Sequence, residues 1–274
     1  MSKATYQKQL ERHLADYKER RLGVRANGEF TFKGVTRKYA HILPRELKWL
    51  NVPEPFRREI IDYVVHRGSI QPHKYFHHLN SSQALAFALF YPYVTGAPRA
   101  LARAVGMKEV VPLDPMFELV PDCEEGTNVD VGWTCEGGAV YCEVKLSERE
   151  FGAATADARH RRKLAEIYEP VLRGQIDDTL LVESRFFADY QILRNLWLAA
   201  RPGRERDHVV FLMPKASAPL VGQLETVLGQ VRAPLAKRVR VVYLESLLSE
   251  LGEDESWDGL GWYARMLIEK YVPA

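Results

Sequence analysis

Residues 128–146 read NVDVGWTCEGGAVYCEVKL, and this stretch decides the fold. Two short apolar runs flank the triplet Glu136-Gly137-Gly138, whose two glycines are typical of a tight turn between strands. Side chains alternate between the two faces of a strand, so Glu143 and Lys145 point to one face while their neighbours point to the other. The stretch therefore predicts a hairpin with one charged face and one apolar face.

The position of the turn also predicts which residues lie opposite each other. If Gly137 and Gly138 form a two-residue turn, Asp130 lies opposite Lys145 and diagonal to Glu143. Directly opposed residues have Cβ atoms about 5 Å apart and diagonal ones about 7 to 8 Å. We therefore expect two carboxylates and one ammonium group to converge, and both carboxylates to face a wet cleft rather than the core.

This set of groups is suited to phosphodiester hydrolysis. The carboxylates of Asp130 and Glu143, with the main-chain carbonyl of Val144, are predicted to bind Mg²⁺, for which Mn²⁺ is the expected substitute. Such a metal polarises a phosphoryl oxygen and lowers the pKa of a bound water, and Lys145 is predicted to orient that water. A salt-bridged charged face on an exposed hairpin is the alternative that the spacing alone leaves open.

Apolar periodicity and turn residues predict the other elements. Strands are expected at 116–120, 129–134, 139–146, 208–213 and 239–244, and helices at 2–21, 44–51, 53–65, 154–168, 186–200, 220–231 and 257–271. Asn80 with Gln83 predicts a capping box that opens a buried helix ending near Pro92, and residues 23–34 have the composition of a loop. The fold class is α/β, a mixed sheet flanked by helices. A helical N-terminal region, 1–70, is expected to precede a main domain, 71–274.

The bulk composition narrows the class of protein. The chain has 274 residues, of which 46% are hydrophobic and 27% charged, an ordinary globular balance. Its longest apolar run, 84–91, is far below the roughly 18 residues that span a membrane, and its polar N-terminus does not suggest a signal peptide. Three cysteines without a C-x-x-C pair do not form a disulfide framework. We therefore expect a cytoplasmic protein without a membrane partner.

Charge is distributed unevenly along the chain. The net charge is +2, but residues 1–80 carry +8, with six of the eight histidines, and the remainder carries −6. A basic run, Arg159 to Lys163, lies in a predicted helix. Both basic segments could contact nucleic-acid phosphates or be solvated surface. His73, His77 and His78 lack an evident further ligand, so surface positions are more expected for them than a metal site.

Four short blocks of sequence resemble the PD-(D/E)XK nuclease superfamily and, within it, a family of bacterial restriction endonucleases. In chain order they are NSSQA at 80–84, EGTNVD at 125–130, EVK at 143–145 followed by Glu148, Phe151 and Gly152, and YQILRN at 190–195. The resemblance covers about residues 75–215 and implies a restriction-endonuclease-like core, with Asp130, Glu143 and Lys145 as the catalytic group. It also implies cleavage of DNA, most simply double-stranded, in restriction.

The resemblance further implies a catalytic role for Gln191, near the site, in holding substrate or water. Arg194 is three positions further along the same helix and therefore shares a face with Gln191, so we predict a phosphate contact. Gln83 stands where many members have a glutamate, and we predict that it contacts substrate. Glu118 or Glu125 is the candidate replacement for the missing carboxylate, whereas Asp122 is too far upstream to join Glu143 on a short strand pair.

Two other functions remain open from the sequence. A nucleic-acid-binding or interaction module could keep this fold without catalysis, and a nuclease could act on RNA or on branched or damaged DNA. Concerted cleavage of both strands would favour a homodimer, although the sequence alone does not identify an interface.

Overall fold

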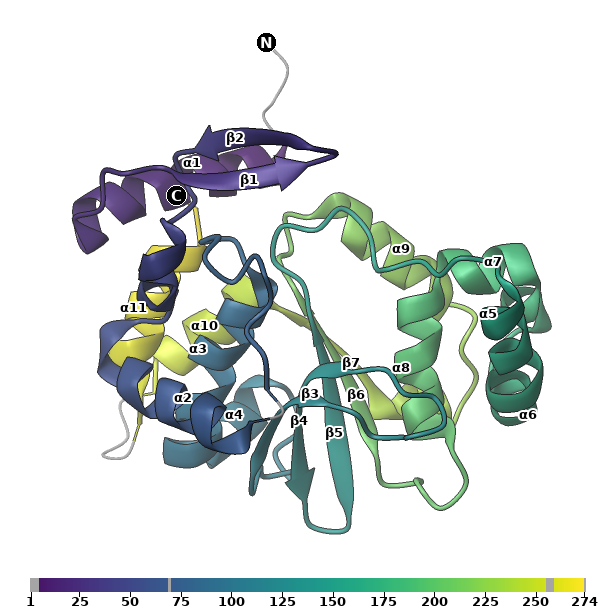
Figure 1. Cartoon of the computed structure of the whole chain (residues 1–274). Helices are drawn as coiled ribbons and strands as arrows, with labels where there is room; N and C mark the ends of the chain where they lie inside the picture. Colours follow the sequence, from purple (N-terminus) through teal and green to yellow (C-terminus); the bar gives the residue numbers. More distant parts are fainter. Residues whose placement is uncertain (1–4, 69, 255–258, 274) are drawn as a thin grey trace.

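A mixed five-stranded sheet lies at the centre of the protein (Figure 1). The computed structural model describes residues 5–68, 70–254 and 259–273. In spatial order the strands are β3 (Pro115–Leu119), β4 (Val129–Cys135), β5 (Gly138–Val144), β6 (His208–Met213) and β7 (Val239–Tyr243). The pairs β3–β4 and β4–β5 are antiparallel, whereas the pairs β5–β6 and β6–β7 are parallel. All five predicted strands are present, and the predicted mixed sheet is confirmed.

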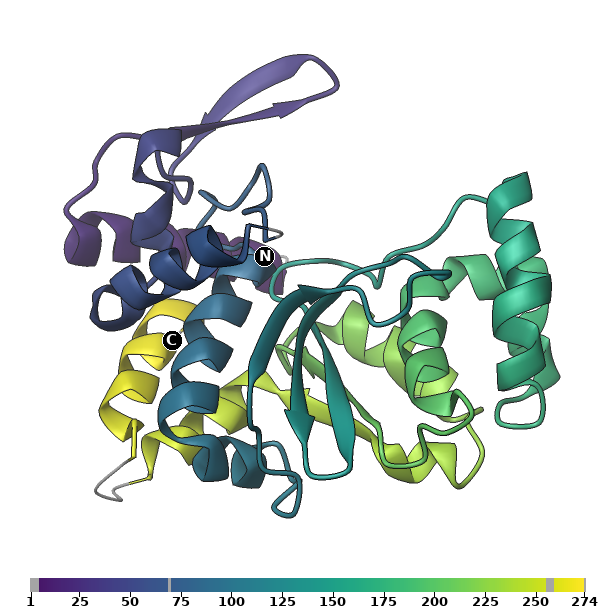
Figure 2. The ribbon, with the colours of Figure 1, turned by 60° about the horizontal axis from the view of Figure 1, so that its bottom comes forward.

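Helices cover both faces of the sheet (Figures 1 and 2). On one side lie α2 (Glu54–Arg67), α3 (Ser82–Gly96), α4 (Pro98–Ala104), α10 (Leu244–Gly252) and α11 (Gly261–Tyr271). On the other lie α8 (Tyr190–Ala200) and α9 (Ala218–Leu228), followed outward by α5 (Ala158–Lys163), η2 (Leu164–Tyr168), α6 (Glu169–Leu172), η3 (Asp178–Leu181) and α7 (Glu183–Ala188), with η4 (Leu235–Arg238) before β7. The α/β class is therefore confirmed.

Each face of the sheet has its own hydrophobic core. The first core lies on the α3 side and includes Val131, Cys142 and Val144. The second core lies on the α8 side and includes Val129, Tyr141 and the buried face of α8. None of the helices in the described residues combines the length and hydrophobicity needed to cross a bilayer.

The register of the central hairpin differs from the expected one. Cys135 pairs with Gly138 and Val131 with Cys142, so the turn is Glu136-Gly137. Gly138 belongs to β5 because the backbone of Arg206 packs against it: a Cβ there would lie 2.6 Å from the Arg206 carbonyl oxygen. Lys145 consequently lies beyond the end of β5, and its expected position opposite Asp130 is wrong.

The N-terminal part contains a hairpin in addition to helices. After α1 (Tyr6–Leu22) come β1 (Gly28–Phe32) and β2 (Val35–Tyr39), and then η1 (Arg45–Asn51) precedes α2. The loop expected around 23–34 is therefore wrong in its second half. The turn residues Lys33 and Gly34 both have positive φ, which suits a tight hairpin. Both strands are largely exposed, so they lack a strong apolar alternation.

The helix α3 begins and ends differently from the prediction. Ser81, not Asn80, caps it by accepting a hydrogen bond from the Ala84 amide, so the expected capping box is wrong. The helix continues past Pro92, which leaves the carbonyl of Ala88 without its helical donor. The hydroxyl of Tyr263 donates to that carbonyl at 2.8 Å and compensates for the lost bond.

Other boundaries also shift. The predicted strand end at Leu244 is the start of α10, a helix that the sequence did not indicate. A break at Asp189 divides the predicted helix 186–200 into α7 and α8. The predicted start of the last helix, Trp257, lies outside the described residues.

The C-terminal helix packs against the N-terminal part of the chain. Lys270 of α11 is buried and donates hydrogen bonds to the carbonyl and the side-chain oxygen of Asn51. The side-chain nitrogen of Asn51 in turn donates to the carbonyls of Phe76 at 2.7 Å and His78 at 2.6 Å. The segment before α3 is thus held by residues from both ends of the chain.

Candidate active site

Glu143 is at the centre of a buried ionic cluster on β5. Its side chain is fully buried, so the expectation that it faces a wet cleft is wrong. One carboxylate oxygen accepts from Lys145 Nζ at 2.8 Å, and the other accepts from Arg194 at 3.0 Å and from Asn195 at 2.9 Å. Burial acts to raise the pKa of Glu143, but the charges of Lys145 and Arg194 lower it below its ordinary value. Glu143 is therefore held as a carboxylate.

Asp130 lies beside this cluster, near the start of β4. Val129 packs in the second core and Val131 in the first, so the side-chain alternation changes at Asp130. Its Oδ2 accepts from the Val144 amide at 2.8 Å, while Oδ1 has no hydrogen-bond partner among the described residues. Burial and the nearby charge of Glu143 raise the pKa of Asp130 well above its ordinary value. The burial of Asp130 and the charge of Glu143 therefore oppose ionisation of Asp130.

Lys145 keeps its proton in this setting. Burial acts to lower the pKa of Lys145, but Glu143, Asp130 and Glu148 together raise it above its ordinary value. Its Nζ also lies 5.7 Å from the centroid of the Phe151 ring. The ammonium group is thus fixed between carboxylates, and its remaining donors can act on a phosphate or a water.

A cavity of about 640 Å³ opens beside Asp130. Four carboxylates line it: Glu11, Glu118, Asp130 and Glu148. Gln83 donates to Glu118 at 2.7 Å and accepts from the His73 amide at 2.7 Å. The part of the cavity wall that comes from the N-terminal residues belongs to α1, the β1–β2 hairpin and the segment before α3. The first 80 residues and the sheet thus build this cavity together.

The chemistry of the donor set fits one hard cation only in part. Asp130 Oδ1 is free, and Glu143 Oε1 accepts a single hydrogen bond, so each has a lone pair left. Within residues 5–68, 70–254 and 259–273 no group of three or more His, Cys, Asp or Glu side chains is arranged to hold a metal. A bound Mg²⁺ would therefore depend on main-chain carbonyls, water and substrate for the rest of its shell, as this ion commonly does.

The structure brings some of the other predicted residues to this site and keeps others apart. Gln83 lines the cavity, and Arg194 contacts Glu143, although it is buried and not open to solvent. Gln191 is occupied by the loop before α5: its Oε1 accepts from the Gly152 amide at 2.8 Å. Val144 is buried in the first core, and its amide binds Asp130.

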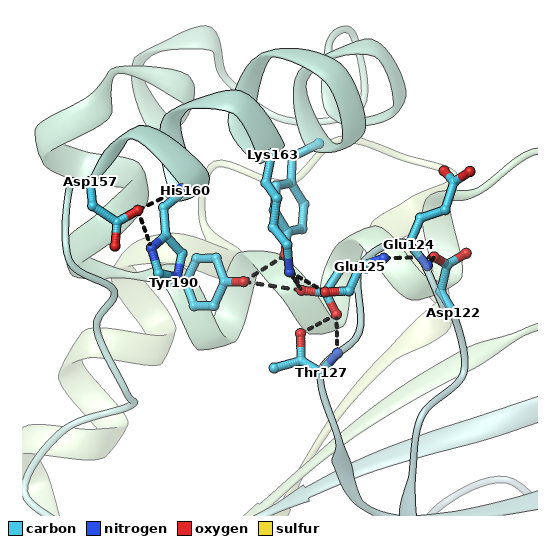
Figure 3. A network of polar contacts seen from close by, with 9 residues as sticks. Asp122, Glu124, Glu125, Thr127, Asp157, His160, Lys163 and Tyr190 are labelled. Atoms are coloured by element: carbon cyan, nitrogen blue, oxygen red, sulfur yellow. Dashed lines mark hydrogen bonds and ion pairs between the residues drawn. The ribbon is translucent and has the colours of Figure 1, made fainter.

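Of the two candidate replacement carboxylates, Glu118 lines the cavity, whereas Glu125 belongs to a separate network (Figure 3). Glu125 is buried and accepts from the Thr127 amide at 2.9 Å and from the Tyr190 hydroxyl at 3.0 Å. The Tyr168 hydroxyl donates to it at 2.5 Å, and Lys163 forms an ion pair with it at 3.4 Å. The network joins the β3–β4 loop to η2 and α8.

The basic run on α5 is largely engaged in ion pairs. Lys163 contacts Glu125, Arg161 pairs with Glu183 at 3.0 Å, and Arg162 pairs with Glu166 at 3.3 Å. Arg161 and Arg162 nonetheless remain exposed, so phosphate contact stays a prediction for them.

Two residues of the site were given no role from the sequence. Asn195 binds Glu143. It lies four residues after Gln191 and therefore on the same helix face, and this spacing could have identified it from the sequence. Glu148 accepts from the amides of Leu146 and Ser147 and lines the cavity. His73 and His78 also line the cavity, whereas the sequence indicated ordinary surface positions.

Comparison with known proteins gives one result. No curated protein and no solved structure matches this chain. Residues 11–272 match the family described as "Restriction Endonuclease associating with ARP", so nearly the whole chain, including the N-terminal wall of the cavity, is covered. The chain belongs to this restriction endonuclease family.

Proposed function

We propose that the protein is a metal-dependent endonuclease that hydrolyses phosphodiester bonds of DNA, as part of restriction in the cytoplasm. Family membership supports the nuclease activity. The observation that carries the metal dependence is the pair Asp130 and Glu143: two adjacent carboxylates beside an acidic cavity, with Lys145 as the cation next to them.

The charge of the cavity supports a cation as part of the site. A phosphodiester is anionic, and four carboxylates line the space where it would bind. Like charges at such short range repel, and the repulsion grows as water is excluded. A bound Mg²⁺ or Mn²⁺ would offset this charge, polarise the phosphoryl oxygen and lower the pKa of the attacking water.

Each side chain then has a distinct task. Asp130, through Oδ1, and Glu143, through Oε1, offer the ligand oxygens. Lys145 is held by Glu143 and would orient the attacking water or offset charge on the phosphate. Arg194 and Asn195 fix the Glu143 carboxylate from the opposite side, so they position it rather than touch the substrate.

The test is incubation of the purified protein with supercoiled plasmid in Mg²⁺, Mn²⁺ or EDTA. We expect nicked or linear products with either metal and none with EDTA. Lys145→Ala should lose cleavage while calorimetry still detects Mn²⁺ binding, because the ammonium group does not ligate the ion. Absence of both cleavage and metal binding in the wild-type protein would instead support a non-catalytic module.

A further inference from the structure

Aromatic and histidine side chains form one part of the cavity wall. Phe30 comes from β1, Tyr39 from β2, and Tyr75 and His78 from the segment before α3, and all four line the cavity. The proposed chemistry at Asp130, Glu143 and Lys145 uses none of them. The lining of the cavity therefore contains both carboxylates and aromatic rings.

The four rings form one packed cluster. The ring centroid of Phe30 lies 5.2 Å from that of Tyr75 and 5.5 Å from that of His78. Tyr75 and His78 are 5.0 Å apart, and Tyr39 is 6.3 Å from Phe30. Phe30, Tyr39, Tyr75 and His78 are each only partly buried, because the cluster is exposed to the cavity instead of being covered by other side chains.

The four rings carry no charge themselves but keep polar capacity, and the Lys74 ammonium lies 4.7 Å from the centroid of the Tyr75 ring. Burial and the neighbouring His77 lower the pKa of His78 to about 3, so its imidazole is neutral. Its Nε2 is buried and has no hydrogen-bond partner in the described residues. Tyr75 and Tyr39 add hydroxyl groups, and no hydrogen bond from either hydroxyl occurs among the described residues. An apolar surface with a few unpaired polar atoms suits a flat heteroaromatic ligand.

We propose that this cavity binds an unpaired nucleobase of the nucleic-acid substrate, stacked on the cluster of Phe30, Tyr39, Tyr75 and His78. Stacking on aromatic side chains is the usual way in which proteins hold unpaired bases, and a duplex would present a base to this wall only after that base is extruded from the stack. The inference rests on the proposed function, because Asp130 lines the same cavity. It assigns the substrate as single-stranded or locally unpaired at this position.

The acidic side chains in the lining explain why the ligand on the aromatic cluster would be a base rather than a phosphate. Glu11, Glu118 and Glu148 repel an anion that has no cation beside it, whereas a base is neutral. A strand lying along the cavity would thus place a base against the rings and a phosphodiester near Asp130.

The experiment compares two probes that carry the same phosphates. One is an oligothymidylate of about a dozen nucleotides, within the span that single-strand binders cover, and the other is an abasic strand of equal length. Fluorescence anisotropy at low salt, in Ca²⁺ and again in EDTA, gives a Kd for each. The ratio of the two Kd values isolates the contribution of the bases. We expect the wild-type protein to prefer the oligothymidylate by about 5- to 150-fold.

Phe30→Leu and Tyr75→Leu should bring that ratio close to unity, because leucine keeps the apolar volume but not the ring face. Circular dichroism checks that both variants fold. Trp262→Leu is the control, since Trp262 is also an exposed aromatic residue but lies on α11, outside the cavity. Its ratio should equal that of the wild-type protein.

Equal Kd values for both probes, no binding of either, or a ratio unchanged in both variants would overturn the inference. Plasmid cleavage is scored separately. Metal-dependent cleavage without a base preference refutes only the nucleobase site, whereas a base preference without cleavage refutes the proposed function.

Discussion

Two buried glutamates in this protein have similar surroundings and different consequences. Glu143 and Glu125 are 0% and 2% exposed, and each forms an ion pair with a lysine. Burial acts to raise the pKa of both, but the surrounding donors lower it below its ordinary value. On burial and pairing alone, the two carboxylates could not be told apart.

Their neighbours separate them. Glu125 is surrounded by the donors Thr127, Tyr168, Tyr190 and Lys163, so the network is satisfied (Figure 3). Glu143 has a second carboxylate, Asp130, beside it; burial and the charge of Glu143 raise the pKa of Asp130, and Asp130 opens onto a cavity. A repelling pair at a cavity therefore marks the candidate active site better than a buried ion pair does.

The largest expected effects come from the repelling pair. Asp130→Asn and Glu143→Ala should each reduce plasmid cleavage at least about a hundredfold. Their stabilities should differ, because Glu143→Ala leaves Lys145 and Arg194 buried without a carboxylate and should cost about 3 to 5 kcal/mol. Asp130→Asn removes a repulsion and should leave the protein at least as stable as the wild type. Urea unfolding monitored by tryptophan fluorescence measures both.

A large loss of stability in Asp130→Asn would mean that its carboxylate supports the fold and that the repulsion has been misjudged. Full cleavage by either variant would remove that residue from the catalytic group.

The opposite outcome is expected for the satisfied network. Glu125→Ala leaves Lys163 and two tyrosine hydroxyls without their acceptor, so the free energy of unfolding should fall by about 3 kcal/mol. Cleavage below the unfolding temperature should persist. Glu124→Ala is the matched control because Glu124 is the exposed neighbour, and it should change neither quantity. Loss of cleavage in folded Glu125→Ala would give the network a catalytic role.

Acid should remove the contribution of Glu125. Hydrogen bonds from Thr127 and Tyr168 outweigh burial and lower its pKa below the ordinary value of 4.5. The stabilisation is therefore complete above the unfolded pKa and is lost as pH falls through the folded pKa. The stability difference between the wild-type protein and Glu125→Gln should be constant from about pH 7 to pH 6 and shrink below about pH 4. A difference that grows on acidification would contradict the sign of this pKa shift.

The smallest effect is expected on the surface near the Glu125 network. If Arg161 and Arg162 contact phosphates, reversing both to glutamate should flatten the salt dependence of DNA binding by about one to two units. Binding in Ca²⁺ at several salt concentrations measures it. Arg265→Glu, on the exposed side of α11, is the control. An identical slope would show that the ion pairs with Glu183 and Glu166 are their whole role.

The parts of the fold that follow from local periodicity were predictable. All five strands of the sheet follow from short apolar runs and the turns that bound them, and Asp130, Glu143 and Lys145 were located by the same pattern. The register was not predictable, because it depends on the backbone of Arg206 packing on Gly138, about 70 residues away in the chain. The contact of Tyr263 with the carbonyl of Ala88, which lets α3 pass Pro92, is equally non-local.

The candidate site shows the same division. The sequence placed the carboxylates and the lysine near one another, but it could not show that Glu143 is buried under Arg194 and Asn195 from a distant helix. The aromatic wall was also invisible, because Phe30 and Tyr75 come from segments without strong periodicity. They become a site only because the Phe30 and Tyr75 rings pack against each other in one wall of the cavity.

The contact between Lys270 and Asn51 determines when, during synthesis of the chain, the aromatic wall can be completed. Asn51 holds the carbonyl of His78 in the aromatic wall, and Lys270 holds Asn51 from the last helix of the chain. The N-terminal part leaves the ribosome before α11 does, so this support is missing until α11 has been synthesised. We expect chains stalled before α11 to lack nuclease activity, which a series of arrested nascent chains assayed on plasmid would reveal. A cell making this protein would thus meet a competent nuclease only after α11 has emerged from the ribosome.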